Sequence, residues 1–296
     1  MAESRGESLY LAAERPCCIA AESVAGYHRA VNTTADSARI ARDPWRPLRY
    51  SWRAPLLLLH ALIAFPLALA VLNPVARRCS IRGERLDHWM TRWWSGRIVR
   101  IFGFRIHRIG EPLAGAVLFV ANHVSWLDIE LMHSQRMMCF VAKAEIERWP
   151  LVGWLASRAG TIYHRRGSTH SLGAVMERVV ERLRGGMAVG VFPEGGTGPG
   201  DHLKTFHARI FQVASDADVP VQPVALCYGS EGKMDLRVPF APKENFFHNF
   251  MRLLGGPSLH ASVHFLEPVA IGDEGRRQTA AAARERIATA LGLPIT

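Results

Sequence analysis

The stretch Ala116-Val-Leu-Phe-Val-Ala-Asn-His-Val-Ser-Trp-Leu-Asp128 joins a short apolar run to a cluster of polar side chains. Residues 116–120 are apolar at consecutive positions, which is typical of a strand buried on both faces. Residues 129–133 follow with helical character. In α/β folds, chemistry is usually found where a strand ends and a helix begins. The stretch therefore predicts an α/β domain with candidate site residues directly after this strand.

The polar cluster contains His123 and Asp128, which are five residues apart. A turn followed by the first helical residues would bring the carboxylate back against the imidazole. Asp128 would then accept a hydrogen bond from one ring nitrogen and leave the other nitrogen as a base for an alcohol proton. The chain has 13 histidines, so a purely structural His123 is the competing interpretation of this spacing.

Short apolar runs alternate with helical stretches from Phe104 onward. Besides residues 116–120, strands are predicted at residues 138–141, 161–163, 187–192, 219–226 and 262–266. Residues 168–184 predict a helix with one apolar face, ended by a Gly-Gly pair, and the alanine-rich residues 274–291 predict another. This alternation indicates an α/β fold. Because no repeat or Pro/Gly/Ser-rich linker divides residues 104–296, one domain is expected there.

The segment before this domain carries a membrane signal. The chain has 36 Lys and Arg against 26 Asp and Glu, a formal charge of +10, which favours a polyanionic partner. Arginines lie on both sides of the apolar run 54–72, so an anionic membrane is expected rather than nucleic acid. The run has 19 residues and would form a helix of about 28 Å, close to the roughly 30 Å of a bilayer core. A spanning helix and a re-entrant or buried helix both remain open.

Residues 88–105 strengthen the membrane prediction. Trp89, Trp93, Ile98 and Ile101 recur near helical spacing, and arginines stand among them at positions 92, 97, 100 and 105, a composition that suits the headgroup boundary. An amphipathic helix that packs its tryptophans on a soluble core is the alternative. We therefore expect a membrane-associated helical segment over residues 46–103. Residues 1–45 show no sustained periodicity and are expected to form a mobile extension.

Three further motifs follow in the α/β region. The glycines of Phe192-Pro-Glu-Gly-Gly-Thr-Gly-Pro-Gly200 allow backbone N–H groups to turn toward an anion. Gly160-Thr-Ile-Tyr-His-Arg-Arg166 ends in adjacent arginines that could grip a phosphate. Val219-Pro-Val-Gln-Pro-Val-Ala-Leu226 has two prolines, which suit a strand edge or the wall of an apolar channel. Each motif alone also fits a purely structural element. The five cysteines lack zinc-ligand spacing, so no metal site is predicted.

The order of the four motifs, from Asn122-His123-x-Ser125-x-x-Asp128 to residues 219–226, closely resembles that of the glycerolipid acyltransferases. The resemblance is strongest to bacterial lysophosphatidate (1-acyl-sn-glycerol-3-phosphate) acyltransferases and covers about residues 85–230. It implies a single αβα domain with a mostly parallel mixed sheet, preceded by an N-terminal membrane-associated helical segment.

The resemblance also implies an O-acyltransferase that acts in lipid biosynthesis. His123 would deprotonate the hydroxyl of a lysophospholipid, and Asp128 would orient the imidazole. The alkoxide would attack acyl-ACP or acyl-CoA, a co-substrate rather than a bound cofactor, and give phosphatidate from 1-acyl-sn-glycerol-3-phosphate. The implied substrate-binding residues are Asn122, Ser125, Lys143, Arg165, Arg166, Glu194, Gly195, Gly196, Thr197 and Pro223. The implied location is the bacterial inner membrane, in contact with membrane lipids, with the active site facing the cytoplasm.

The chain departs from the family in its third motif. The family commonly has Phe-Pro-Glu-Gly-Thr-Arg, whereas here Gly195 is followed by Gly196 and Thr197. The arginine that would grip a phosphate is therefore missing, and Lys204 and Arg165 are candidates to replace it. Acceptors with another headgroup, such as lyso-ornithine lipid or another lysophospholipid, remain open. The remaining alternatives are a hydrolase that uses the same pair and a non-catalytic membrane-binding scaffold.

Overall fold

A twisted sheet forms the centre of the protein in the computed structural model, which describes residues 43–71, 73, 76–149, 152–164, 169–229, 233–270 and 275–294. The strands of this sheet are β3 (Phe104–Ile109), β4 (Leu118–Ala121), β5 (Cys139–Lys143), β6 (Ile162–His164), β7 (Val189–Val191), β8 (Val221–Tyr228) and β9 (Leu259–Phe265). Their order is β3-β9-β8-β4-β7-β5-β6, and every neighbouring pair is parallel except β8 with β9. A small hairpin joins β1 (Ser80–Ile81) and β2 (Glu84–Arg85). The predicted mostly parallel mixed sheet is confirmed.

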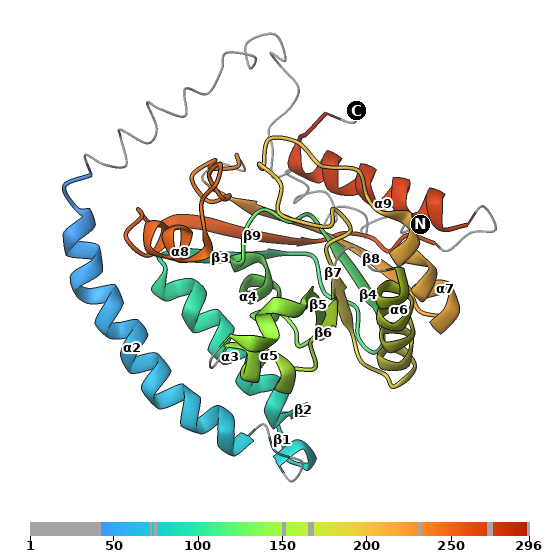
Figure 1. The fold of residues 1–296 in the computed structure, drawn as a ribbon, viewed down its shortest axis with the longest axis horizontal. Coiled ribbons are helices and arrows are strands. Elements are labelled where there is room, and N and C mark those ends of the chain that lie inside the picture. Colours follow the sequence, from blue (N-terminus) through green and yellow to red (C-terminus); the bar gives the residue numbers. More distant parts are fainter. Residues whose placement is uncertain are drawn as a thin grey trace, which may run out of the picture.

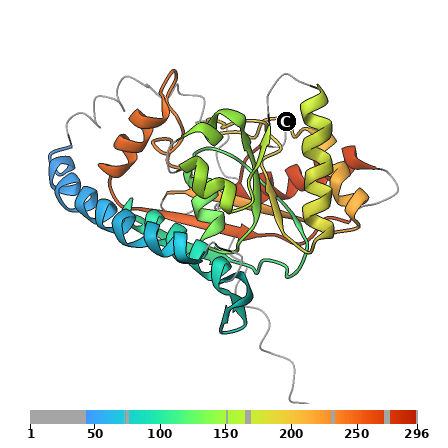
Figure 2. The same cartoon turned by 60° about the horizontal axis from the view of Figure 1, so that its bottom comes forward.

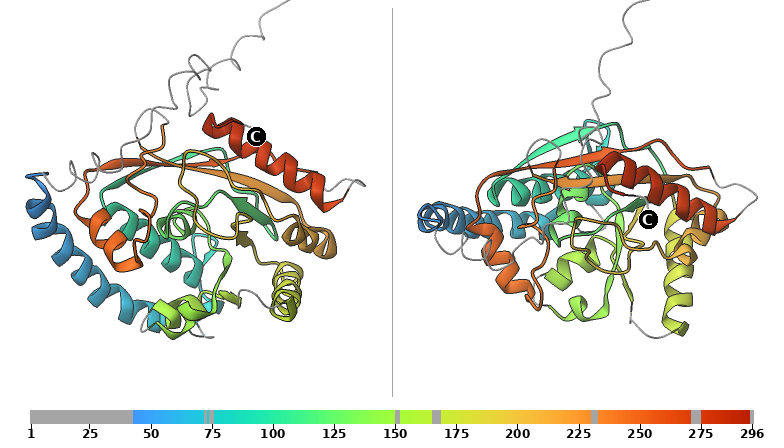
Figure 3. Two further views of the ribbon diagram at one scale, coloured as in Figure 1. Left: turned by 45° about the horizontal axis from the view of Figure 1, so that its top comes forward. Right: turned by 90° about the horizontal axis from the view of Figure 1, so that it is seen from above.

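Helices cover both faces of the sheet (Figure 3). The helices are α2 (Arg46–Val71), α3 (Leu86–Ile101), α4 (Leu127–His133), α5 (Val152–Arg158), α6 (Thr169–Arg184), α7 (Gln212–Ala217), α8 (Phe246–Leu254) and α9 (Arg276–Leu291). α9 lies on one side of the sheet, and α3 and α4 lie on the other. The apolar side chains of α6, α7 and α9 belong to one core cluster and those of α3 and α4 to the other. This is the αβα arrangement.

The position of β4 in the middle of the sheet explains why residues 116–120 are apolar at consecutive positions. Leu118 and Val120 belong to the core on the α9 side of the sheet, and Phe119 and Ala121 belong to the core on the α3 and α4 side. All four side chains are fully buried. Because alternate residues of a strand point to opposite faces, a strand that is covered on both faces needs an unbroken apolar sequence.

The prediction that the prolines of residues 219–226 mark a strand edge was wrong, because β8 lies near the centre of the sheet between β9 and β4. Pro223 accepts a hydrogen bond from the Leu266 N–H at 3.0 Å but has no N–H to return. The side-chain Nε2 of Gln222 donates to the Leu266 carbonyl instead, at 3.1 Å. A side-chain amide therefore replaces the missing backbone donor just beyond the end of β9.

Several elements differ from the sequence prediction. The helical pattern of residues 88–105 ends early: α3 ends at Ile101, and the chain turns at Gly103 (φ +89°), a backbone conformation that favours glycine. The residues that follow form β3, an edge strand that was not predicted. The short helix α8 was also not predicted. The helices at residues 168–184 and 274–291 are confirmed, with starts shifted by one or two residues.

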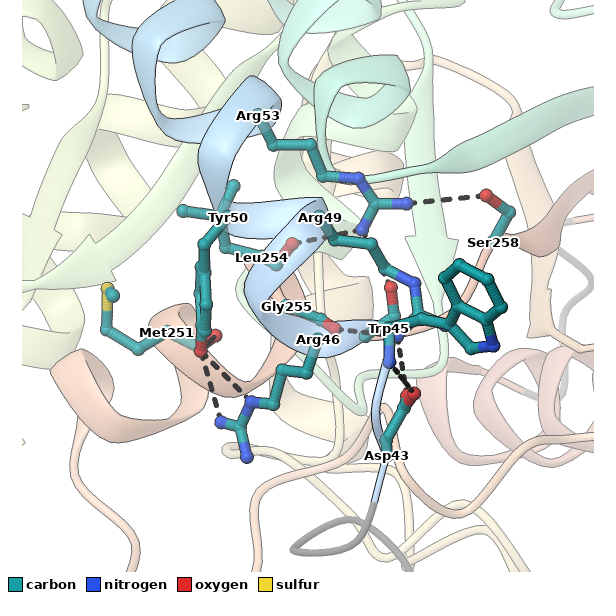
Figure 4. Close-up of polar contacts among 11 residues, drawn as sticks. Asp43, Trp45, Arg46, Arg49, Tyr50, Arg53, Met251, Leu254, Gly255 and Ser258 are labelled. Atoms are coloured by element: carbon teal, nitrogen blue, oxygen red, sulfur yellow. Dashed lines mark hydrogen bonds and ion pairs between the residues drawn. The ribbon is translucent and has the colours of Figure 1, made fainter.

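The beginning of α2 is fixed to the end of α8 by buried polar contacts (Figure 4). The guanidinium of Arg53, which is 1% exposed, donates to the carbonyls of Leu254 (3.0 Å) and Gly256 (2.7 Å). Arg49 donates to the carbonyl of Gly255 at 3.1 Å. The last carbonyls of a helix have no partner within it, so these arginines supply donors that α8 needs. Two of the arginines that precede the apolar run thus face the protein rather than a membrane.

The rest of α2 lies along α3 on the flank of the molecule (Figures 1 and 2). His60 packs against Trp93 and Trp94, with ring centroids 5.3 and 5.0 Å apart, and Ala64 and Ala68 are buried beside α3. The other side of α2 exposes large apolar side chains, namely Leu48, Trp52, Leu56, Leu58, Leu59, Leu62, Ile63, Leu67 and Leu69. By length and composition, α2 is a candidate to cross a membrane.

Candidate active site

The turn between β4 and α4 brings the predicted pair together. Nδ1 of His123 lies 2.7 Å from Oδ2 of Asp128, whose side chain is fully buried, whereas the His123 side chain is 16% exposed. The same Oδ2 accepts the backbone N–H groups of Val124 (2.7 Å) and Ser125 (2.9 Å). Because Oδ2 acts as an acceptor, the contact places the imidazole proton on Nδ1. The chain turns before α4 begins, which allows a spacing of five residues to make this contact.

Asn122 and Ser125 hold the turn from inside the protein. The side-chain amide of Asn122 donates to the Leu226 carbonyl at 2.9 Å and accepts the Leu226 N–H at 2.8 Å, which ties the turn to β8. Oγ of Ser125 lies 3.4 Å from the N–H of Leu127, at the start of α4. Both side chains are buried. Their direct contact with a substrate stays a prediction.

The loop after β7 clamps the backbone of His123 on two sides. Oε1 of Glu194 accepts the His123 N–H at 2.8 Å, and the His123 carbonyl accepts the Gly198 N–H at 2.6 Å. The second carboxylate oxygen of Glu194 accepts the Lys204 N–H at 3.1 Å. Burial raises the pKa of the Glu194 carboxyl, and these two N–H groups oppose that shift. Glu194 was predicted to contact the substrate headgroup, but both of its carboxylate oxygens accept hydrogen bonds from the protein backbone.

The glycine-rich loop beside Glu194 is exposed in part. Gly195 has φ +70°, and a Cβ at this position would lie 3.0 Å from the His207 ring, so a side chain there would be strained and crowded. Gly196 and Thr197 are half-buried. The Thr197 carbonyl accepts a hydrogen bond from Nζ of Lys204 at 2.6 Å. Lys204, one candidate to replace the missing arginine, therefore lies on this loop.

Two of the remaining predicted residues, Lys143 and Pro223, lie in strands of the sheet. Lys143 is the exposed last residue of β5, at the same sheet edge as the ends of β4 and β7 because these strands are parallel. Pro223 is buried in β8. Arg165 and Arg166 directly follow β6 but lie outside the described residues. Their proposed contact with a headgroup stays a prediction.

Two further side chains contact the pair, and neither was among the predicted site residues. The Phe192 ring stacks on the His123 imidazole, with centroids 4.1 Å apart and planes at 16°. Phe192 belongs to the third motif, so its position in that motif was an available signal. The Tyr228 hydroxyl donates to Oδ1 of Asp128 at 2.7 Å. Tyr228 is 100 residues from Asp128 in sequence, and no local pattern connects them.

Glu194→Gln is expected to lower both stability and activity, because an amide has one acceptor oxygen where the carboxylate has two. Either the His123 N–H or the Lys204 N–H would face an NH₂ group, at a cost of about 1–3 kcal/mol. Thermal unfolding and initial rates of the acyl transfer that the resemblance implies should be compared between this variant and Glu177→Gln, in which the replaced side chain is exposed on α6. Equal stability and rates in both variants would contradict a clamping role for Glu194.

Comparisons with known proteins identify the family of this chain. A family model described as Acyltransferase matches residues 105–227. A lyso-ornithine lipid O-acyltransferase from Pseudomonas aeruginosa is 39% identical over 68% of this chain and 78% of the relative. A 1-acyl-sn-glycerol-3-phosphate acyltransferase from Neisseria gonorrhoeae is also 39% identical, over 47% of this chain and 55% of the relative.

A solved structure has the same fold. The 1-acyl-sn-glycerophosphate (LPA) acyltransferase PlsC from Thermotoga maritima matches with a TM-score of 0.55 at 19% identity, over 82% of this chain and 99% of that chain. The site and fold define an α/β enzyme with a histidine–aspartate pair at the carboxyl edge of its sheet. The chain belongs to the acyltransferase family, and it is an acyltransferase. The resemblance inferred from the four motifs is confirmed.

Proposed function

We propose that the protein transfers a fatty acyl group from a thioester to the free hydroxyl of a lysolipid, with His123 as the general base. The contact between His123 and the buried Asp128 carries this proposal. With the proton on Nδ1, Nε2 is the basic nitrogen of the neutral ring. Asp128 holds the ring in this tautomer and stabilises the imidazolium that forms when Nε2 takes the hydroxyl proton.

The reaction needs no acyl-enzyme. The hydroxyl oxygen attacks the thioester carbonyl as His123 removes its proton, so the new C–O bond forms and the C–S bond breaks. The imidazolium then returns the proton to the departing thiolate. The partly exposed glycine-rich loop beside His123 offers backbone N–H groups for the developing oxyanion. Lys143, at the same sheet edge, is a second candidate for the oxyanion or for a phosphate of the donor.

The third motif and the relatives favour lyso-ornithine lipid as the acceptor. The motif has Gly196 and Thr197 where a phosphate-gripping arginine is common, so one bidentate phosphate contact is absent from it. The Pseudomonas aeruginosa lyso-ornithine lipid O-acyltransferase also matches over a larger share of both chains than the Neisseria gonorrhoeae enzyme does. Lysophosphatidate is the second candidate, supported by the identity of 39% to the latter enzyme.

We further propose that α2 lies in one leaflet rather than spanning the bilayer. Its apolar side chains are exposed along the helix, while its opposite side is held by α3 and α8 over most of its length. A helix held in this way places the flank of the domain at the lipid surface, where lysolipids are found. We assign this surface to the cytoplasmic side of the bacterial inner membrane, because acyl-ACP and acyl-CoA, the proposed donors, are cytosolic.

The acceptor is tested by competition. The purified protein in vesicles is given one labelled acyl thioester and equal amounts of lyso-ornithine lipid and lysophosphatidate, and the products are separated by mass spectrometry. Acylated ornithine lipid is expected to form at least about tenfold faster, because one missing charge-assisted contact is worth about 1.5–3 kcal/mol. Phosphatidate as the faster product would overturn the acceptor assignment and leave the acyl-transfer proposal intact.

A further inference from the structure

Tyr228 is the last residue of β8, and its side chain contacts Asp128 of the candidate site from within the protein core. Its side chain is fully buried, and its ring packs edge-on against Phe104 with centroids 5.6 Å apart. Its hydroxyl lies 2.7 Å from Oδ1 of Asp128. This contact has no role in the proton transfer proposed for His123 and Asp128.

The two oxygens of Asp128 have different partners. Oδ2 accepts the His123 Nδ1–H and the backbone N–H groups of Val124 and Ser125. Oδ1 accepts the Tyr228 hydroxyl. The Tyr228 hydroxyl is thus positioned to fix the rotation of the Asp128 carboxylate. It also competes with the His123 imidazole for the negative charge of that carboxylate. Hydrogen bonds to a buried charged group are among the strongest in proteins, because little water competes with them.

The hydroxyl acts as a donor throughout the range in which histidine titrates. Burial, together with the neighbouring Asp128, raises the pKa of Tyr228 well above its usual value of 10. The phenol therefore keeps its proton while His123 gains or loses one. This constancy lets the tyrosine influence the pair without changing its own charge.

Few other ionisable groups face the trio in the described part of the chain. Cys227 precedes Tyr228 on β8 and is buried on the opposite face of the strand. Glu194 contacts the His123 backbone from the loop after β7, and Lys204 contacts Glu194 from the same loop. Glu194 and Lys204 carry opposite charges, and neither contacts Asp128 in the described structure. A change at Tyr228 should therefore act mainly through Asp128.

We propose that Tyr228 is a positioning residue that sets the pH at which His123 serves as the base. By drawing charge toward Oδ1, its hydroxyl weakens the attraction between Asp128 and the imidazolium, so the imidazole releases its proton at lower pH. This inference rests on the proposed role of His123. A hydroxyl that merely satisfied a buried oxygen would add stability but would leave the pH dependence of catalysis unchanged.

Tyr228→Phe tests the inference through the pH profile of kcat/KM for the lysolipid, which reports the free enzyme. The acidic limb is expected to move to higher pH by about 0.5–1 unit, because Asp128 then binds the imidazolium more strongly. KM for the lysolipid should stay within about twofold, since Tyr228 does not reach the substrate. Tyr50→Phe is the matched control. It removes a hydroxyl that donates to the Met251 carbonyl at 2.7 Å, remote from Asp128, and its profile should not move.

A second variant keeps the inference testable if Tyr228→Phe does not fold. Incorporation of a ring-fluorinated tyrosine at position 228 keeps the ring and makes the hydroxyl a stronger donor, so the acidic limb should move to lower pH. Shifts in opposite directions support the inference, and the fluorinated protein decides alone if Tyr228→Phe does not fold. An unmoved limb in a folded variant overturns it. His123→Ala separates the two proposals: if it stays active, the proposed base is wrong, whatever the profile of the tyrosine variants.

Discussion

His123→Ala is expected to lower the rate of acyl transfer by about 10²- to 10⁴-fold, the usual contribution of a positioned general base. The imidazole is the only group of the pair that can take a proton from the acceptor hydroxyl, since both oxygens of Asp128 are occupied by buried donors. KM for the lysolipid should change little, because the loss falls on the transition state. Initial rates with a labelled thioester and a lysolipid in vesicles measure this effect.

A histidine–aspartate contact on the surface supplies the control. His202 lies 2.7 Å from Asp201, the same distance as in the active-site pair, but both side chains are about half exposed. His202→Ala should retain nearly full activity, so a large loss specific to His123→Ala would separate proton transfer from a general effect of losing a histidine. Comparable rates in wild type and His123→Ala would exclude His123 as the base.

Asp128→Asn is expected to lower kcat by a similar factor, about 10²- to 10⁴-fold, while the protein stays folded. The amide oxygen can keep the three donors that now meet Oδ2. The amide NH₂ can donate to Tyr228, because a hydroxyl accepts as well as donates. Geometry is therefore retained, but the negative charge that stabilises the imidazolium is lost. Steady-state rates and thermal unfolding measure the two effects separately.

Asp128→Ala is the informative contrast. Alanine leaves the Val124 and Ser125 N–H groups without their acceptor in a buried site, which should cost about 1–3 kcal/mol per unsatisfied group in addition to the activity. Asp201→Asn, an equivalent change on the surface, should affect neither property. An Asp128→Asn protein that turned over at the wild-type rate would show that the carboxylate charge plays no part in the reaction.

Local patterns were sufficient to predict the centre of the site. The apolar run of β4 predicted a strand buried on both faces, and the polar residues after it predicted a turn at its carboxyl end. The His123–Asp128 contact follows from that turn, since it joins residues only five apart. Likewise, one apolar face and a terminal glycine pair were enough to predict α6.

Long-range contacts could not be predicted in this way. Tyr228 contacts Asp128 because β8 pairs with β4 in the sheet. The sequences of these two strands do not indicate that they are neighbours. The prolines of residues 219–226 were expected at a strand edge or in the wall of an apolar channel. Pro223 instead lies in a central strand, where the neighbouring Gln222 side chain supplies the donor that proline lacks. Arg53 was grouped with arginines that flank an apolar run, whereas in the structure it caps the end of α8. In each case the contacted group is distant in sequence: Asp128 for Tyr228, Leu266 for Gln222 and Leu254 for Arg53.

The exposed side of α2 supports the proposed contact of the protein with a membrane. Monomeric soluble proteins rarely expose apolar patches of more than a few hundred Å². A helix lined on one side with leucine, isoleucine and tryptophan, and fixed to the domain on the other, fits the surface of a bilayer better than water. The lysolipid would thus meet the His123–Asp128 pair from the membrane, and the water-soluble donor would arrive from the aqueous side.

The fate of the labelled acyl group tests the central claim most directly. The purified protein in lysolipid-containing vesicles receives an acyl thioester labelled in the acyl chain, and the label is followed into ester product, free fatty acid and protein. We predict that the label passes into a new lipid ester, in a reaction that needs the lysolipid, with none bound covalently to the chain. Release of the label as free fatty acid at the same rate with and without lysolipid would identify a hydrolase and contradict this account.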